Sequence, residues 1–224
     1  MSELVPIFPL NLVAFPGMSL PLHVFEERYR ALVRHLLTVP EHTDRLFAVV
    51  TIREGYEVGN HEARSMYRTG CLMQLTEVEP YDDGRYDVMA VGRRRVRIID
   101  TDVSEAFLQA EVADLETQEE LSPDTAREAA RALTVFGDYR TAVSRLRGDD
   151  VMTGPLPRDP ELLSYVLAST CSLTLPERQQ LLESPTAAER LGLLRRLMQR
   201  ELRAIAAIPS LPATEVARSG WNPN

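Results

Sequence analysis

The chain has 224 residues, 44% of them hydrophobic and 26% charged, so it is long enough for one large or two small globular domains. No apolar run reaches the roughly 18 residues of a membrane span, and the amino-terminal MSELVPIFPL lacks the basic segment of a secretory signal. The net charge of −8 argues against general nucleic-acid binding, which depends on a basic excess. We therefore expect a cytoplasmic protein without membrane contact.

All 25 basic residues are arginine, and the chain contains no lysine. A phosphate-binding P-loop requires a lysine, as do Ser-Lys proteolysis and Schiff-base chemistry. This chain cannot perform any of these reactions by itself.

The first half of the chain reads as short strands with one helix. Short apolar segments at 4–10 and 12–15 are broken by Pro9 and Pro16, and apolar residues at steps of three and four predict a helix over 22–37. Strands are predicted at 45–52 and 70–78 because both segments are apolar and rich in residues that favour sheets.

A hairpin follows at Tyr81–Arg85, where Asp83-Gly84 permits the positive φ of a tight turn. A long strand is predicted over 86–99, with Gly92 as a bulge or a point of close backbone approach. A last strand at 107–115 completes a small curled sheet.

The second half is helical. Capping residues and apolar periodicity predict helices near 123–147, 160–171, 176–184 and 187–207. Residues 209–224 read as a disordered tail.

The one dense basic run, Gly92–Ile98, contains four arginines. On a regular strand Arg93, Arg95 and Arg97 share one face. That face is either an anion or RNA contact, or a solvated surface balanced by neighbouring acids.

Motifs for catalysis are absent from the sequence. There is no HExxH zinc pair and no G-x-S-x-G nucleophile elbow. Cys71 and Cys171 are far apart and read as small core residues. We expect no metal, no cofactor and no catalytic residue.

The segment PIFPLNLVAFPGMSLPLHVFEERYRALV, residues 6–33, closely resembles the signature of the Lon protease N-terminal, substrate-binding domain. Further resemblances to that family lie at Gly70–Leu75, Asp83–Tyr86, Val91–Ile98, Leu175–Glu183 and Ala188–Leu191. Together they cover about residues 4–205. Each motif alone is weak, but the set is specific.

This resemblance implies an α+β fold, with a PUA-like β pseudo-barrel that contains one inserted helix and a C-terminal helical bundle after it. We expect the barrel at 1–117 and the helical subdomain at 118–208. The implied function is recognition of unfolded or tagged polypeptides, without the ATPase and Ser-Lys peptidase of a full Lon protease. A stand-alone module of this kind could work with a protease or chaperone in trans.

The proline- and phenylalanine-rich opening segment is the predicted polypeptide-binding region, although most of its large side chains are expected in the core. The candidate residues there are Phe15, Pro16, Met18, Leu22, Phe25 and Tyr29. The main alternative is a PUA-like RNA or small-ligand binder that uses Arg93, Arg95 and Arg97. A hydrolase with an unrecognised site is the third and weakest hypothesis.

Overall fold

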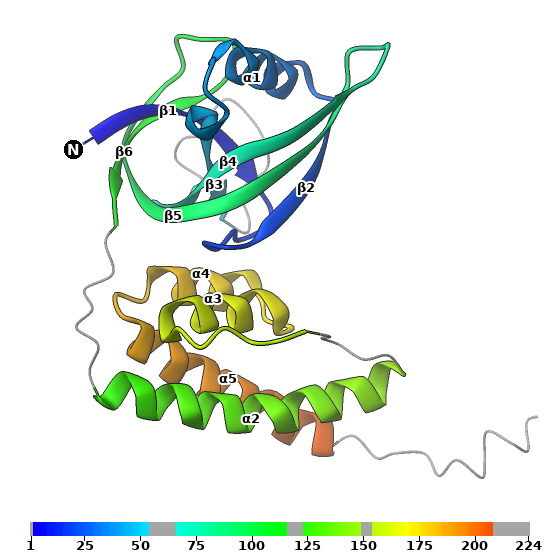
Figure 1. The fold of residues 1–224 in the computed structure, drawn as a ribbon, viewed down its shortest axis with the longest axis vertical. Coiled ribbons are helices and arrows are strands. Elements are labelled where there is room, and N and C mark those ends of the chain that lie inside the picture. Colours follow the sequence, from blue (N-terminus) through cyan, green and yellow to red (C-terminus); the bar gives the residue numbers. More distant parts are fainter. Residues whose placement is uncertain (1, 54–65, 116–122, 149–153, 208–224) are drawn as a thin grey trace, which may run out of the picture.

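A β-rich lobe and a helical lobe make up the molecule in the computed structural model (Figure 1). The structure describes residues 2–53, 66–115, 123–148 and 154–207. The predicted disordered tail, 209–224, lies outside the described residues. The domain limits at 117 and 208 stay a prediction.

Six strands form a single sheet in the order β2-β5-β4-β3-β1-β6, and β6 also pairs with β5. Five of them therefore close into a ring, while β2 pairs with β5 alone among the described strands. All pairings are antiparallel except the parallel pair β1–β3. The strands are β1 Ser2–Leu10, β2 Ser19–Val24, β3 Leu46–Thr51, β4 Thr69–Pro80, β5 Tyr86–Asp102 and β6 Gln109–Asp114.

The length of β5 makes the closure possible. Its first part pairs with β2 and its second part with β6, and register shifts in its pairings with β4 and β6 bend it. Gly92 lies between the two parts, where a Cβ would stand 2.2 Å from the carbonyl oxygen of Phe15. The prediction of a close backbone approach at Gly92 is therefore confirmed.

The helix predicted at 22–37 is shorter in the structure. Helix α1 spans Glu27–Thr38 and packs on the sheet through Tyr29, Leu32 and Leu36. Leu22 instead belongs to β2, because the backbone of 19–24 pairs with β5. A 3-10 turn, η1 at His42–Asp44, leads into β3.

The four predicted helices are present in the helical lobe: α2 Pro123–Arg147, α3 Pro160–Thr170, α4 Leu175–Glu183 and α5 Ala187–Ala207. Asp159 caps α3 by accepting from the amide of Leu162, and Thr174 with Glu177 forms a capping box on α4. These local signals explain why the sequence located the helix ends so closely.

The two lobes share a core at their junction. Residues 12–15 were predicted as a strand but form an irregular connection, from which Val13 and Phe15 enter the apolar cluster of the helices. Phe15 is completely buried and its ring centroid lies 6.3 Å from that of Tyr165 on α3. Side chains of this connection pack against the helices, and its backbone does not pair with a neighbouring strand of the described sheet.

Candidate functional site: a groove on the outer face of the sheet

Strands β2, β5 and β4 lie side by side and present one face away from the buried clusters. Their register places two rows of three residues on this face, since side chains alternate along each strand. We call these six residues the outer β face: Pro21, Met89 and Glu77 in one row, and His23, Asp87 and Glu79 in the next. The row between them, Leu22, Val88 and Val78, points the other way, and Val88 is buried in the apolar cluster that α1 forms with the sheet.

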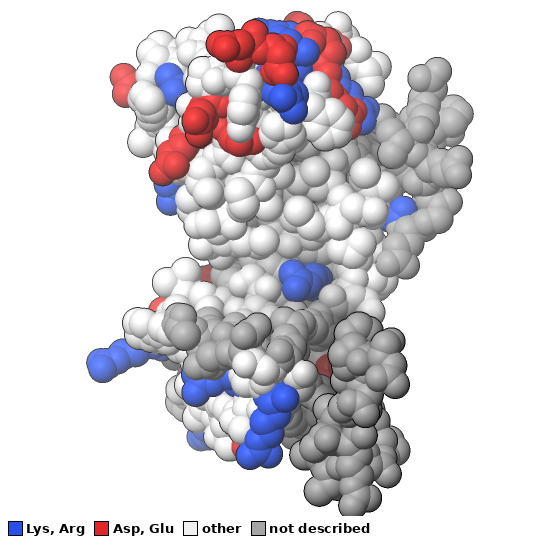
Figure 2. Space-filling view, turned by 90° about the vertical axis from the view of Figure 1, so that its right-hand side faces the viewer, with Lys and Arg blue, Asp and Glu red and all other residues white. Residues whose placement is uncertain are grey.

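The outer β face is hollowed into a groove of about 590 Å³, lined by these six residues together with Leu22, Val78 and Val88. Strand β2 and the β4–β5 hairpin are on the side of the molecule that Figure 2 presents. On that side, charged side chains gather at the end of the β-rich lobe away from the helices. A broad uncharged band separates them from the lobe junction (Figure 2).

Hydrogen bonds fix one end of the groove. Asp87 accepts from the Tyr81 hydroxyl at 2.6 Å, and its other carboxylate oxygen lies 2.6 Å from Nδ1 of His23. The Tyr81 hydroxyl and then His23 hold the pKa of Asp87 below its ordinary value, and Asp87 raises the pKa of Tyr81 in return. This network ties the hairpin to β2.

An aromatic cluster adjoins the same end. The His23 ring lies 6.2 Å from that of Phe25 and 5.9 Å from that of Tyr81, measured between centroids. Phe25 is 61% exposed and Tyr81 is 42% exposed, which is unusual for large aromatic side chains. The groove therefore ends in apolar surface that has no cover among the described residues.

The six residues predicted to bind polypeptide divide into three groups. Phe15 and Tyr29 are buried in the two lobes, so neither can contact a ligand in this conformation. Pro16 and Met18 are half-buried near the lobe junction. Leu22 is among the residues around the groove, but it is partly buried and packs against the apolar cluster beneath α1, whereas Phe25 stands exposed beside the groove and remains the stronger candidate.

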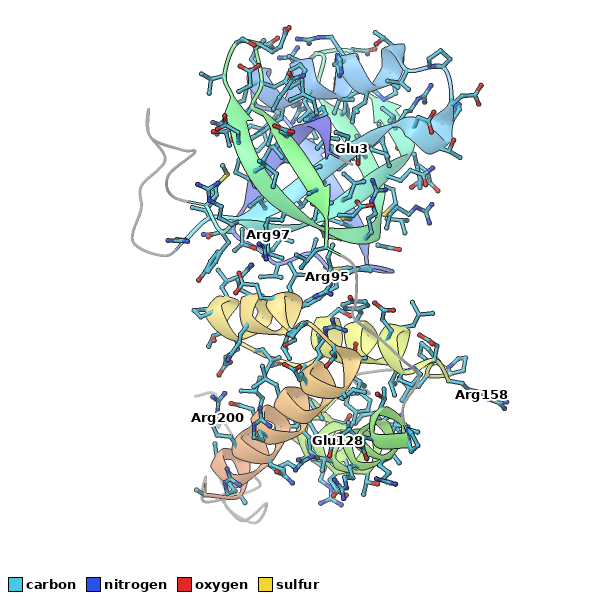
Figure 3. The ribbon with its side chains drawn as sticks, turned by 90° about the vertical axis from the view of Figure 1, so that its left-hand side faces the viewer. Glu3, Arg95, Arg97, Glu128, Arg158 and Arg200 are labelled. Carbon is cyan, nitrogen blue, oxygen red and sulfur yellow. The ribbon has the colours of Figure 1, made fainter. Side chains whose placement is uncertain are left out.

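The three arginines predicted to share a face do not form one exposed surface. The β4–β5 register shifts opposite Arg93, and Arg95 is only 2% exposed. The Arg95 guanidinium donates to the carbonyls of Leu182 and Ser184 at the end of α4, so it joins the lobes (Figure 3). Only Arg93 and Arg97 are exposed, which corrects the prediction for Arg95.

A second hollow, of about 480 Å³, lies between the lobes. The structure brings Pro16 together there with Arg93 and Arg95, and Leu162 and Tyr165 of α3 form the opposite wall. The arginine side chains that line this hollow already have partners within the protein. Arg94 pairs with Glu3 and Asp114, and Arg93 donates to Gln74.

No group of three metal-ligating side chains gathers in the part of the chain that the structure describes. Cys71 and Cys171 are buried, and burial raises the pKa of each thiol to about 12, far from that of a reactive thiolate. None of the described helices is long and apolar enough to cross a membrane.

Sequence reasoning missed most of the groove. The alternation of Pro21 and His23, and of Asp87 and Met89, marks residues on one face of two strands, and that signal was available. Which strands are neighbours, and in which register, was not readable from local sequence. The outer β face therefore became visible only with the pairing of β2, β5 and β4.

The closed sheet, the attached helical lobe and the surface groove define an α+β domain with two lobes. The chain belongs to the family of the ATP-dependent protease La (LON) substrate-binding domain, which matches residues 4–200. This confirms the family predicted from the motifs.

Relatives and solved structures agree with this assignment. Lon protease 2 of Herpetosiphon aurantiacus is 32% identical over 202 residues, covering 88% of this chain and 24% of that protein. Lon protease 2 of Desulfotalea psychrophila is 29% identical over 209 residues, covering 91% of this chain and 26% of that protein. The chain thus spans about a quarter of the length of these relatives.

Two solved structures share the fold of this chain. A Lon N-terminal domain protein from Xanthomonas campestris matches with a TM-score of 0.59 at 24% identity, covering 86% of this chain and 96% of that one. The N-terminal domain of the Mycobacterium avium complex Lon protease matches with a TM-score of 0.63 at 19% identity, covering 88% and 98%. These likenesses confirm the mixed α+β fold, and the PUA-like description stays a prediction.

Proposed function

We propose that this chain is a non-enzymatic polypeptide-recognition module that binds extended, unfolded or tagged segments on the outer β face. The observation that carries the proposal is the apolar surface at the groove, formed by the exposed Pro21, the half-buried Met89 and the exposed Phe25 beside it, in a family described as substrate-binding. Uncovered apolar surface of this kind is typical of binding sites.

The edge of the sheet supports the same function. In the described sheet β2 pairs only with β5, so its second edge is open to an added strand. Extended polypeptides commonly bind proteins in this way, with backbone hydrogen bonds for affinity and side-chain contacts for selection. Pro21, which lacks an amide hydrogen, limits such pairing in the middle of β2 and disfavours self-association.

A partner protease or chaperone in trans would receive the bound polypeptide under this proposal. The absence of lysine from the sequence supports a role without Ser-Lys peptidase chemistry. A nucleic-acid function has less support because Arg95 is buried and Arg94 is paired with two carboxylates.

Fluorescence anisotropy with a labelled, unstructured apolar peptide tests the proposal. We expect saturable binding that persists at moderate salt and is weakened about tenfold by Phe25→Ala combined with Met89→Gln, since a few apolar anchors carry most of such binding energy. Val103→Ala is the control, because Val103 is 75% exposed but lies after β5, outside the groove.

Two results would contradict the proposal. One is the absence of saturable peptide binding, and the other is an equal loss in the Val103→Ala control. A matched RNA oligomer in the same salt series tests the alternative. Binding to RNA with a steep salt dependence, lost on replacing Arg93 and Arg97, would favour the arginine strand instead.

A further inference from the structure

Two carboxylates on β4 border the apolar part of the groove. Glu77 stands opposite Met89 and Glu79 stands opposite Asp87 in the β4–β5 pairing, and both glutamates are exposed. Within the described part of the chain neither forms an ion pair, whereas Asp87 is occupied by Tyr81 and His23. The groove therefore has one uncompensated negative side.

We infer that the outer β face selects polypeptide segments in which an arginine or lysine lies next to apolar residues. This inference rests on the proposed function and adds the chemistry of the recognised segment.

The spacing of the groove suits such a segment. Neighbouring strands are about 4.8 Å apart, so a basic side chain whose stem covers Met89 can reach the carboxylate of Glu77 on the next strand. Alternate residues of an extended strand are about 7 Å apart, which is also the separation of Glu77 from Glu79 along β4. Two basic residues at positions i and i+2 could thus pair with both glutamates.

The rest of the molecule favours the same partner. The exposed Phe25 ring beside the groove offers a face for a cation. The net charge of −8 attracts cationic segments over a longer range at low salt. An acidic segment would meet unpaired carboxylates and be rejected.

The test uses the full chain and four peptides with one apolar sequence, which differ only in carrying Arg, Lys, Gln or Glu at two alternate positions. We expect the Arg and Lys peptides to bind about fivefold more tightly than the Gln peptide, as two exposed ion pairs allow. The Glu peptide should bind most weakly. The double variant Glu77→Gln/Glu79→Gln should remove the difference between Arg and Gln peptides without weakening the Gln peptide.

A matched control keeps the total charge change constant. Glu105→Gln/Glu111→Gln neutralises two exposed acids that lie outside the groove and should leave the Arg preference intact. If this control removes the preference as fully as the groove variant, the effect belongs to net charge and the inference is wrong.

The remaining outcomes separate the two proposals. If Arg and Gln peptides bind equally well and Phe25→Ala weakens both, charge selection is wrong while polypeptide recognition stands. If none of the four peptides binds, the proposed function fails and the inference fails with it.

Discussion

Gly92 is the residue at which the connection between β1 and β2 touches the middle of β5. Its amide donates to the carbonyl of Met18 and its carbonyl accepts from the amide of Gly17, both at 2.9 Å. Gly92→Ala would place a Cβ 2.2 Å from the backbone oxygen of Phe15, so the backbones must separate. We expect a loss of at least about 2 kcal/mol in the free energy of unfolding, measured by urea denaturation.

The control for Gly92 is Gly137→Ala on α2. A Cβ at Gly137 meets nothing within 4 Å, and the residue is exposed within a helix. This substitution should raise stability by up to about 1 kcal/mol, because alanine favours helices over glycine. Equal effects of the two substitutions would mean that the close approach at Gly92 is unimportant.

Arg95 provides the second prediction at this scale. Its buried guanidinium donates to the carbonyls of Leu182 at 2.9 Å and Ser184 at 2.6 Å, so Arg95→Met leaves buried acceptors with fewer donors. We expect a loss of about 3 kcal/mol in unfolding free energy. Arg97→Met, at an exposed position of the same strand, should change it by less than about 0.5 kcal/mol. Similar losses in both variants would contradict a specific role for Arg95.

Among the elements, the β4–β5 hairpin depends on a titratable contact with β2. The pKa of Asp87 lies below its ordinary value of 3.8, first because the Tyr81 hydroxyl donates to it and then because of His23. Since the folded-state pKa is lowered, this stabilisation is complete above about pH 5, declines below that, and is lost as the pH falls through the folded-state value.

Tyr81→Phe removes the larger of the two contributions. We expect the pKa of Asp87 to rise toward 3.8, measured from the carboxyl chemical shift in an NMR titration. Tyr67→Phe is the control, because Tyr67 lies outside this network and should leave the titration unchanged. An unaltered Asp87 titration in Tyr81→Phe would show that the hydroxyl does not set this pKa.

At the scale of the whole molecule, Phe15 makes the lobes one folding unit. It leaves the β1–β2 connection and is fully buried with Tyr165 in the core of the helices. We expect a single calorimetric transition for the intact chain. Phe15→Ala should cost about 3–5 kcal/mol and resolve the transition into two. Phe25→Ala, at a position that is 61% exposed, should leave the single transition in place.

A single unshifted transition in Phe15→Ala would contradict this coupling. The binding predictions are independent of it, because the outer β face lies on β2, β5 and β4 and does not include Phe15. Stability and recognition can therefore be altered by separate substitutions in the same opening segment.

Local signals made much of this fold predictable. The capping residues Asp159 and Thr174 and the turn at Gly84 act within a few residues, so helix ends and the hairpin were located from sequence. The start of α1 was predicted wrongly, because Leu22 fits a helical period as well as a strand. Long-range pairing of 19–24 with β5 decided between the two.

The sequence by itself determined the family, the four helices of the second half, five of the six strands and the lack of lysine, since these depend on residue identity and near neighbours. Only the tertiary structure decided which apolar and arginine residues face solvent. Phe15 and Phe25 are equally hydrophobic, yet one is in the core and one is exposed, and Arg95 is buried while Arg97 is not. The physical reason is that burial depends on segments distant in the chain, here the helices that pack against the β-rich lobe.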